Sequence, residues 1–367
     1  MHRIIKAPET MTSRERVIRT FHYEKTDRVT IGYSANPGIH QRLMKALGAV
    51  NEEQLLQALG VDYRGIDAPY IGPQLFDVPE GRQVNQLEGC IMRKVEHASG
   101  FYWDFCDFPL KDAEDEDFEN FKVPNPDHFD YALALDQAKS YEGQYGLYVG
   151  NCGIPDIINS NGRIMGMEDI LCHLVTENEA ALDFVHRRVA FQLGMLERTL
   201  DTCKGYIDFM WLGEDLGTQI APMISMDLYR KVFRPIHKQF VDLAASYGIP
   251  TIIHTCGSSS WVYEDFIEIG IRGVDTLQPE AVNMSPQYLA EHFGGRLNFR
   301  GCISTAGPVA YGTVEDVRKN CQETLEVMKK CRGYHFAPTH DLQDNSPTEN
   351  VIAMYQAAHD FGRYENT

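Results

Sequence analysis

The stretch IPTIIHTCGSSSWVYEDFIEIGIRGVDTLQ (Ile249–Gln278) contains the repeating unit of the fold. A short apolar run at Ile249–Cys256 is followed by a helical segment at Ser259–Ile269, and a second apolar run follows at Arg272–Gln278. Apolar runs of this length, separated by an amphipathic helix, are typical of parallel strands that are covered on both faces. The stretch therefore predicts one strand–helix–strand unit.

The same alternation continues on both sides of this stretch. Further strands are predicted at Val29–Ala35, Gly146–Asn151, Ile207–Asp215, Arg296–Ser304 and Gly333–His340. Further helices are predicted at Gly166–His173, Glu177–Cys203, Ser225–Tyr247, Ser285–Phe293, Thr313–Lys330 and Pro347–Phe361. No glycine-rich phosphate loop follows any of these strands, and polar residues recur at their carboxyl ends, where the active sites of α/β barrels lie.

We therefore expect a (β/α)8 TIM barrel rather than an open sheet. The expected organisation is a single domain over residues 1–367, with a helical N-terminal extension at residues 1–28. Residues 104–130, rich in Asp, Glu, Phe and Pro, are expected to form an acidic surface excursion with a short helix.

Composition excludes several classes of partner. The formal net charge is -18, with 52 acidic against 34 basic residues, which argues against binding to nucleic acid or to anionic membranes. No run approaches the roughly 18 apolar residues that span a bilayer, and the N-terminus has no apolar signal core, so a cytoplasmic protein is expected. The nine cysteines are an odd number, which argues against a disulfide framework.

The predicted strand ends carry a candidate metal site. His254 and Cys256 are two residues apart on one strand, so their side chains point to the same face. Imidazole with thiolate favours Zn2+ over hard cations, and a catalytic zinc ion needs about three protein ligands. His340, at the end of the last strand, is the expected third ligand, with Glu214 and Cys302 as alternatives. The competing interpretation is a core histidine beside a buried cysteine.

Two adjacent carboxylates, Glu214 and Asp215, are the expected catalytic residues. Neighbouring residues on a strand face opposite sides, so at most one of the two is expected to face the barrel axis, unless the strand has already ended. A helix cap or a salt bridge is the alternative for this pair. Expected substrate-binding residues, which also suit packing or loop capping, are Tyr33, Tyr70, Asn151, Trp211, Gln219 and Cys302.

At these residues the chain resembles the uroporphyrinogen decarboxylase family. The resembling stretches are TSRERVIRTFHYEKTDRV (Thr12–Val29), WLGEDLGTQIAPMIS (Trp211–Ser225), IIHTCGSS (Ile252–Ser259) and FAPTHDLQDNSPTENVIAMYQAA (Phe336–Ala358). The family fold is a (β/α)8 barrel, in agreement with the pattern above. True decarboxylases of this family share a Trp-Met-Arg-Gln-Ala-Gly-Arg motif, whereas the segment after Asp27 here reads RVTIGYSANPGIHQRLMKALG.

The chain is more similar to the corrinoid-dependent methyltransferases of this family, which hold zinc on a His-x-Cys pair and a later cysteine. His254 and Cys256 match the pair, but the later segment reads APTHDLQ, with Thr339 and His340 where the cysteine is expected. The resemblance implies zinc-assisted transfer of a methyl group from a small donor to the Co(I) corrinoid (cobalamin) of a partner protein.

A methoxylated aromatic compound is the favoured donor, as in an O-demethylase, with methanol and methylamine as alternatives. The resemblance also suggests a homodimer. Two other functions remain open at this point: decarboxylation of uroporphyrinogen or another small acid, and a non-catalytic protein that binds a ligand or a corrinoid protein.

Overall fold

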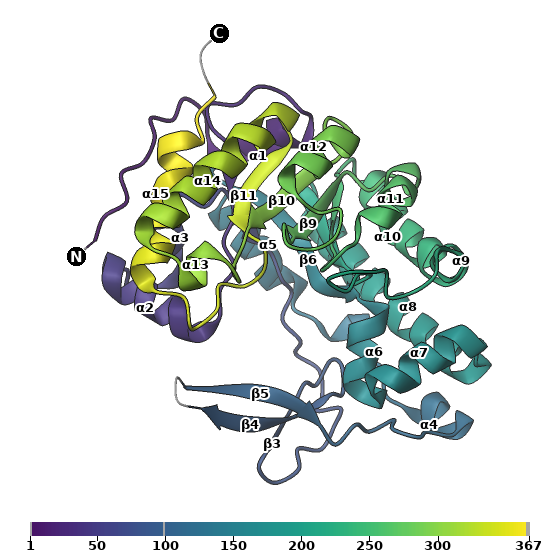
Figure 1. Ribbon diagram of the computed structural model, residues 1–367. Helices are drawn as coiled ribbons and strands as arrows, with labels where there is room; N and C mark the ends of the chain where they lie inside the picture. Colours follow the sequence, from purple (N-terminus) through teal and green to yellow (C-terminus); the bar gives the residue numbers. More distant parts are fainter. Residues whose placement is uncertain (1, 98–99, 365–367) are drawn as a thin grey trace.

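The computed structural model of the chain is a barrel of parallel strands, and it describes residues 2–97 and 100–364. Eight parallel strands follow one another in the order β1-β11-β10-β9-β8-β7-β6-β2. A backbone hydrogen bond of 2.9 Å from Asp62 N to Ile31 O links the β1 and β2 ends of this order. The predicted (β/α)8 barrel is thereby confirmed (Figure 1).

The strands of the barrel are short. They are β1 (Thr30–Ile31), β2 (Tyr63–Gly65), β6 (Gly146–Pro155), β7 (Phe209–Gly213), β8 (Thr251–His254), β9 (Gly273–Leu277), β10 (Asn298–Ile303) and β11 (Tyr334–Pro338). All but β2 correspond to strands predicted from the sequence. The strand β2 carries only three residues, too few for a recognisable periodicity.

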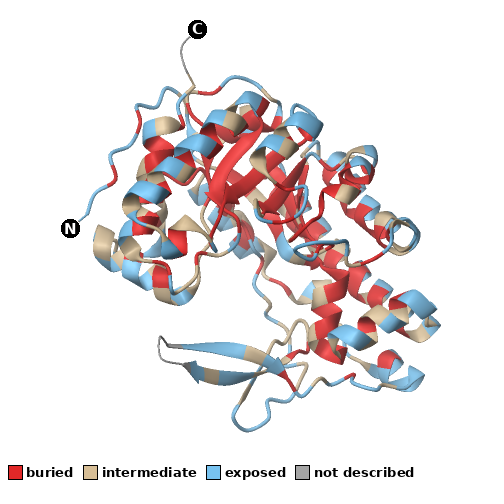
Figure 2. Ribbon diagram, viewed as in Figure 1, coloured by how far each residue is buried: buried red, intermediate tan, exposed pale blue. Residues whose placement is uncertain are grey.

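The helices pack around the strands, with their exposed faces outward (Figure 2). They are α1 (Ser13–Phe21), α2 (Pro37–Leu47), α3 (Glu52–Leu59), α4 (Asp115–Asn120), α5 (Tyr131–Ser140), α6 (Ile157–Met165), α7 (Met167–Thr176), α8 (Glu179–Thr202), α9 (Met226–Leu228), α10 (Arg234–Ser246), α11 (Tyr263–Ile269), α12 (Pro286–Phe293), α13 (Pro308–Tyr311), α14 (Val314–Met328) and α15 (Thr348–Phe361). A π-helical turn at Tyr229–Phe233 joins α9 to α10.

Two apolar layers hold the barrel together. The larger layer lies between the strands and the surrounding helices and includes Ile253, Val274 and Phe336. A smaller cluster fills the barrel interior and includes Tyr63, Phe209 and Trp211. Strands covered on both sides need apolar residues at nearly every position, which explains why the sequence shows continuous apolar runs rather than alternation.

Helix α1 packs at the amino ends of the strands. Its Val17 and Phe21 belong to the interior cluster. Thr12 caps the helix, accepting a hydrogen bond of 3.1 Å from Glu15 N. Residues before β1 thus cover the floor of the barrel, opposite the end where the active sites of such barrels lie.

A three-stranded antiparallel sheet was not predicted. It comprises β3 (Arg82–Val84), β4 (Ile91–His97) and β5 (Gly100–Cys106), and it projects beside α6 and α7 (Figure 1). Exposed aromatic side chains on β5 break the apolar–polar alternation that marks a half-buried strand, so no strand was predicted there. The following segment carries the short acidic helix α4. Within the described ranges, none of the helices combines the length and apolarity needed to cross a membrane.

Candidate metal centre

A cavity of about 190 Å³ opens at the carboxyl ends of the barrel strands, and we call it the mouth cavity. Strands β6 to β11 and the segments that follow them supply nearly all of its walls. Its lining residues are Ser34, Tyr148, Asn151, Cys152, Trp211, His254, Asp275, Thr276, Arg300, His340 and Asp341. Asn151, His254 and His340, which lie at separate strand ends in the sequence, therefore meet at one location, as expected for a TIM barrel.

Three potential metal ligands converge at the mouth cavity. One ligand atom each from His254, Cys256 and His340 lies within 4.8 Å of the others. The His254 Nε2 to Cys256 Sγ distance is 3.4 Å. Two such atoms on one tetrahedral zinc ion would be about 3.6 Å apart, given the usual Zn–N and Zn–S bond lengths. The geometry of this pair therefore fits a shared zinc ion.

The turn after β8 places the Cys256 side chain. Gly257 has a φ of +70°, and a Cβ there would lie 2.2 Å from Gly217 O. Only glycine suits both this backbone conformation and this close approach. Asp215 Oδ1 accepts a hydrogen bond of 2.7 Å from Cys256 N, and Asp215 Oδ2 accepts one of 2.9 Å from Asn159 Nδ2. The loop after β7 thus fixes the loop after β8.

His254 is oriented by two side chains from β9. Its Nδ1 lies 3.1 Å from Asp275 Oδ2 and 2.6 Å from Thr276 Oγ1. Burial tends to lower the pKa of His254, but the hydrogen bond and charge of Asp275 outweigh it, and the pKa is raised. With Nδ1 engaged, Nε2 is the ring atom available to a metal ion, which is the usual arrangement for a metal-binding histidine.

Asp275 is itself held by a buried arginine. Arg300 Nη1 donates a hydrogen bond of 2.6 Å to Asp275 Oδ1, and its guanidinium stacks 4.6 Å over the Trp211 ring. Burial tends to raise the pKa of Asp275, but the Arg300 charge dominates and lowers it to about 2. Asp275 therefore stays ionised, and the chain Arg300–Asp275–His254 links the barrel interior to the metal site.

The charges at the site suit a divalent cation. Asp215 Oδ1 lies 3.8 Å from His254 Nε2, and burial together with Asp215 raises the pKa of the Cys256 thiol. A buried thiol beside carboxylates stays protonated unless a cation favours the thiolate. A nitrogen, sulfur and nitrogen donor set matches zinc better than magnesium or calcium. The residues present thus fit the metal that the sequence suggested.

Three of the other predicted site residues lie at or beside this cavity. Asn151 and Trp211 line it, and Asp215 contacts the metal ligands as described. Glu214 instead points away: its carboxylate accepts hydrogen bonds of 2.8 Å from Ile157 N and 3.1 Å from Ile158 N, at the start of α6. Burial raises the pKa of Glu214 to about 8. Adjacent carboxylates thus face opposite directions, and only Asp215 faces the metal site.

The remaining predicted residues are dispersed. Tyr33 lines a separate cavity beside α3, and Tyr70 lines another beside α8. Gln219 is exposed and donates a hydrogen bond of 3.2 Å to Gln278 Oε1, whereas Cys302 is buried in the core outside the mouth cavity. Asp275 and Arg300 were not among the site residues predicted from the sequence. Asp275 is the one charged residue of β9, and Arg300 is the one charged residue of β10. A lone charge in a mostly apolar strand is rare unless it is paired, and this pattern could have identified both residues.

Comparison with known proteins agrees with the fold. The family model described as Uroporphyrinogen decarboxylase (URO-D) matches residues 200–361. The resemblance predicted from the sequence is confirmed. The matched residues include His254, Cys256 and His340, whereas β1, β2 and β6 precede them.

Among solved structures, a methyltransferase from Methanosarcina mazei aligns over 96% of this chain and 99% of its own, with a TM-score of 0.66 and 16% identity. At that identity the similarity establishes the shared fold. Dispersin B aligns over 92% of this chain and 99% of its own at 9% identity, with a TM-score of 0.38, too low to support an argument. A sequence comparison with curated proteins gives no match.

Proposed function

We propose that this protein is a zinc-dependent methyltransferase that moves a methyl group from a small donor to the Co(I) corrinoid of a partner protein. The observation that supports the proposal most is the convergence of His254, Cys256 and His340 at the carboxyl end of the barrel. The similarity in fold to a protein named as a methyltransferase supports the same reaction class.

The metal would be held by His254 Nε2, Cys256 Sγ and one ring nitrogen of His340. Bound there, a zinc ion would supply Lewis-acid activation of the donor atom that loses the methyl group. Asp275 holds the His254 ring in position through Nδ1, and Asp215 fixes the Cys256 backbone. Asp215, whose Oδ1 lies 3.8 Å from His254 Nε2, would act as a further ligand or exchange a proton with the departing group.

The walls of the mouth cavity favour a flat, uncharged donor. The rings of Tyr148 and Trp211 lie next to each other, with centroids 5.1 Å apart and planes tilted by 59°. The Arg300 charge is paired with Asp275 and covered by Trp211, so it is not free to bind a substrate carboxylate. Asn151 offers an amide at the rim. These features support a methoxylated aromatic donor, with methanol and methylamine as smaller alternatives.

The same walls argue against a decarboxylase that acts on a porphyrinogen. Such a substrate carries many carboxylates and requires several free cations around it. Arg300 is the one basic side chain, histidines aside, among the described residues that line the mouth cavity, and it is already paired. The homodimer suggested by the resemblance stays a prediction.

Elemental analysis of the purified protein is the direct test. We expect about one zinc ion per chain in the wild type, and loss of the metal in His254→Ala and Cys256→Ala. Cys172→Ser, at an exposed cysteine on α7, is the matched control and should retain the metal. Methyl transfer to Co(I) cobalamin from a panel of methoxyarenes, methanol and methylamines should fall at least 100-fold in both metal-site variants.

Two results would contradict the proposal. One is wild-type protein, prepared without chelators and supplied with zinc, that binds none. The other is unchanged methyl transfer in both metal-site variants. If the metal binds but no donor in the panel is demethylated, the non-catalytic alternative replaces methyl transfer.

A further inference from the structure

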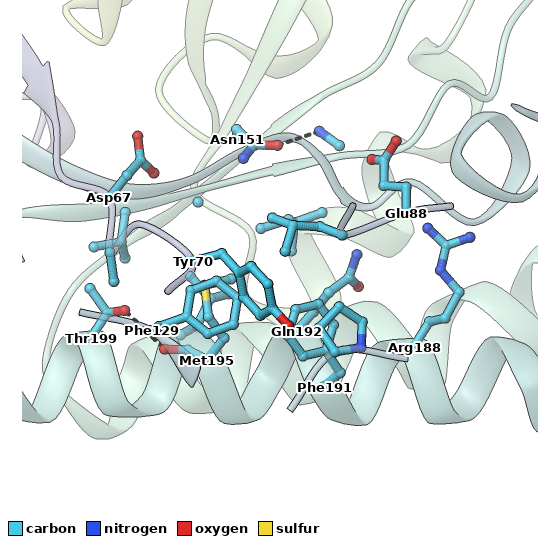
Figure 3. Close-up of a pocket in the computed structure, with 18 of the residues that line it drawn as sticks. Asp67, Tyr70, Glu88, Phe129, Asn151, Arg188, Phe191, Gln192, Met195 and Thr199 are labelled. Carbon is cyan, nitrogen blue, oxygen red and sulfur yellow. Dashed lines mark hydrogen bonds between the residues drawn. The ribbon is translucent and has the colours of Figure 1, made fainter. Parts of the chain in front are cut away.

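A second cavity, of about 310 Å³, lies between strand β6 and helix α8, and we call it the side cavity (Figure 3). Its volume is at the lower end of the roughly 300–1,000 Å³ typical of small-molecule sites. Asn151 lines both the side cavity and the mouth cavity. The two cavities are therefore neighbours on opposite sides of the end of β6, and the side cavity contains none of the metal ligands.

Aromatic and apolar side chains form most of the side cavity. Tyr70 and Phe129 pack against each other with ring centroids 5.3 Å apart, and Phe129 lies 5.9 Å from the Phe191 ring. Met195 and Leu196 on α8 add further apolar surface. Figure 3 shows these rings gathered in the middle of the cavity. Walls of this kind bind a flat apolar group.

Arg188 is the unusual residue of the side cavity. It is 92% buried, since only 8% of its surface is exposed. Its Nη1 donates to Asn161 Oδ1 at 2.8 Å and to Ser160 O at 3.2 Å. Within residues 2–97 and 100–364, its Nε and Nη2 have no hydrogen-bond partner and no carboxylate forms an ion pair with it. Its guanidinium carbon also lies 5.7 Å from the centre of the Phe184 ring. Buried cations are normally paired with an anion, and among the described residues Arg188 has no such ion pair.

A second buried polar group faces the same space. Gln192 lies one helical turn after Arg188 and also lines the cavity. Its Oε1 is buried and has no hydrogen-bond partner among the described residues. Buried side-chain oxygens are rarely left without a partner, so a hydrogen-bond donor on a bound ligand would satisfy this atom.

The acidic residues near Arg188 do not balance the positive charges there, so one further negative charge on a ligand would be favourable. Glu88 lines the cavity beside it but lies closest to Arg163, at 3.9 Å, and Arg163 lies 3.8 Å from Asp156. Burial raises the pKa of Asp156 to about 8, so this carboxyl is largely neutral at pH 7. Arg188 and Arg163 then share one other acidic neighbour, Glu88. Asp67, the other acidic residue of the cavity, lies at the opposite end (Figure 3).

We propose that the side cavity binds a small organic acid with one aromatic ring, whose carboxylate pairs with Arg188 while the ring packs against Tyr70, Phe129 and Phe191. The guanidinium fork matches a carboxylate in shape as well as in charge. A hydrogen-bond donor on the ligand would reach Gln192 Oε1. The site is independent of the metal centre and of methyl transfer.

Isothermal titration calorimetry on the full chain tests this proposal, with phenylacetate as the probe. Phenylacetamide keeps the ring and loses the charge, and acetate keeps the charge and loses the ring. We expect both to bind at least tenfold more weakly than phenylacetate, since a charge-assisted hydrogen bond and ring burial are each worth at least that factor. This comparison uses the unmodified protein, so it does not depend on how any variant folds.

Variants then locate the site. Arg188→Met should weaken phenylacetate binding at least tenfold. Arg198→Met, at an exposed arginine of the same helix outside the cavity, is the matched control and should bind as the wild type does. Glu88→Gln removes the neighbouring negative charge and should tighten binding. His254→Ala should leave binding unchanged, which separates this site from the proposed metal centre.

Four results would overturn the proposal. They are equal binding of phenylacetate and phenylacetamide, wild-type affinity in Arg188→Met, weaker binding in Glu88→Gln, and no detectable phenylacetate binding at millimolar concentrations. Loss of binding in His254→Ala would place the ligand in the mouth cavity and would equally overturn it.

Discussion

The floor and the mouth of the barrel both contain buried arginines and aspartates, but they differ in how completely these groups are paired. At the floor, Asp62 accepts hydrogen bonds of 2.6 Å from both Arg16 Nη1 and Arg28 Nη1, and a further one of 2.7 Å from Ile31 N. Asp27 accepts one of 2.7 Å from Arg16 Nε. Every charge at the floor thus has an opposite charge within hydrogen-bonding distance.

At the mouth, the buried charges are paired, but not every metal-ligating side chain has a hydrogen-bond partner. Arg300 and Asp275 are paired, and Asp275 holds His254 Nδ1. The ring of His340 has no hydrogen-bond partner in the part of the chain that the structure describes. His254 and His340 line the mouth cavity, and Cys256 Sγ lies 3.4 Å from His254 Nε2. A fully paired buried cluster stabilises a fold, whereas metal-ligating side chains that converge without a complete set of hydrogen bonds indicate a ligand site. We therefore infer that the buried charges at the floor stabilise the fold and that the side chains at the mouth bind a ligand.

The largest expected effect is at the floor. Asp62→Ala leaves Arg16 and Arg28 buried without their shared carboxylate, and breaking a buried ion pair in this way costs about 3–5 kcal/mol. Urea denaturation of the variant should show that loss in the free energy of unfolding. Asp183→Ala, at an exposed residue of α8, is the control and should change it by less than about 0.5 kcal/mol. A loss under about 1 kcal/mol for Asp62→Ala would contradict the structural role of the floor.

Acid should weaken the floor over a defined pH range. Burial tends to raise the pKa of Asp62, but Arg28 and Arg16 lower it from 3.8 to about 2. Because the folded-state pKa is the lower one, Asp62 contributes stability above about pH 4 and loses it as pH falls toward 2. The loss is on the order of 2–3 kcal/mol. Denaturation curves between pH 5 and 2 measure it. An Asp62→Asn variant with the same pH slope in this range would exclude Asp62 as the cause.

At the mouth, the expected effect is on metal affinity. Asp275→Asn removes the charge that orients His254, and loss of such a partner typically costs 10–100-fold in metal affinity. Competition with a chelator of known affinity measures it. Asp341→Asn serves as the control, because Asp341 is another acid of the mouth cavity and forms no hydrogen bond or ion pair with the side chains of the metal ligands among the described residues. Zinc affinity unchanged in Asp275→Asn would show that the Arg300–Asp275–His254 chain does not support the metal.

The smallest effect on stability is expected at His340, which is exposed. His340→Ala should weaken zinc binding but change the free energy of unfolding, measured in chelator, by less than about 0.5 kcal/mol. Comparing the free energies of unfolding of His340→Ala and Asp62→Ala tests directly whether the floor and the mouth differ in their contribution to stability. A large loss of stability in His340→Ala without metal would remove the distinction between the two ends of the barrel.

Prediction from the sequence succeeded where a single pattern sufficed. Apolar runs located β6 to β11, because strands buried on both faces carry few polar residues. The two-residue spacing of His254 and Cys256 predicted that their side chains share one face, and their ligand atoms lie 3.4 Å apart. Prediction failed for the sheet β3–β5, because the exposed aromatic residues of β5 interrupt the apolar–polar alternation expected of a strand. The sequence also could not decide whether Glu214 or Asp215 faces the mouth.

The sequence by itself determined the succession of strands and helices, the acidic charge and the presence of a His-x-Cys pair at a strand end. These properties depend on neighbours along the chain. Only the tertiary structure decided that His340 reaches that pair, that Asp275 and Arg300 support it, and that Arg188 is buried without a counter-charge. Each of these facts depends on distances between residues far apart in sequence, which are set when the barrel closes and its helices pack around it.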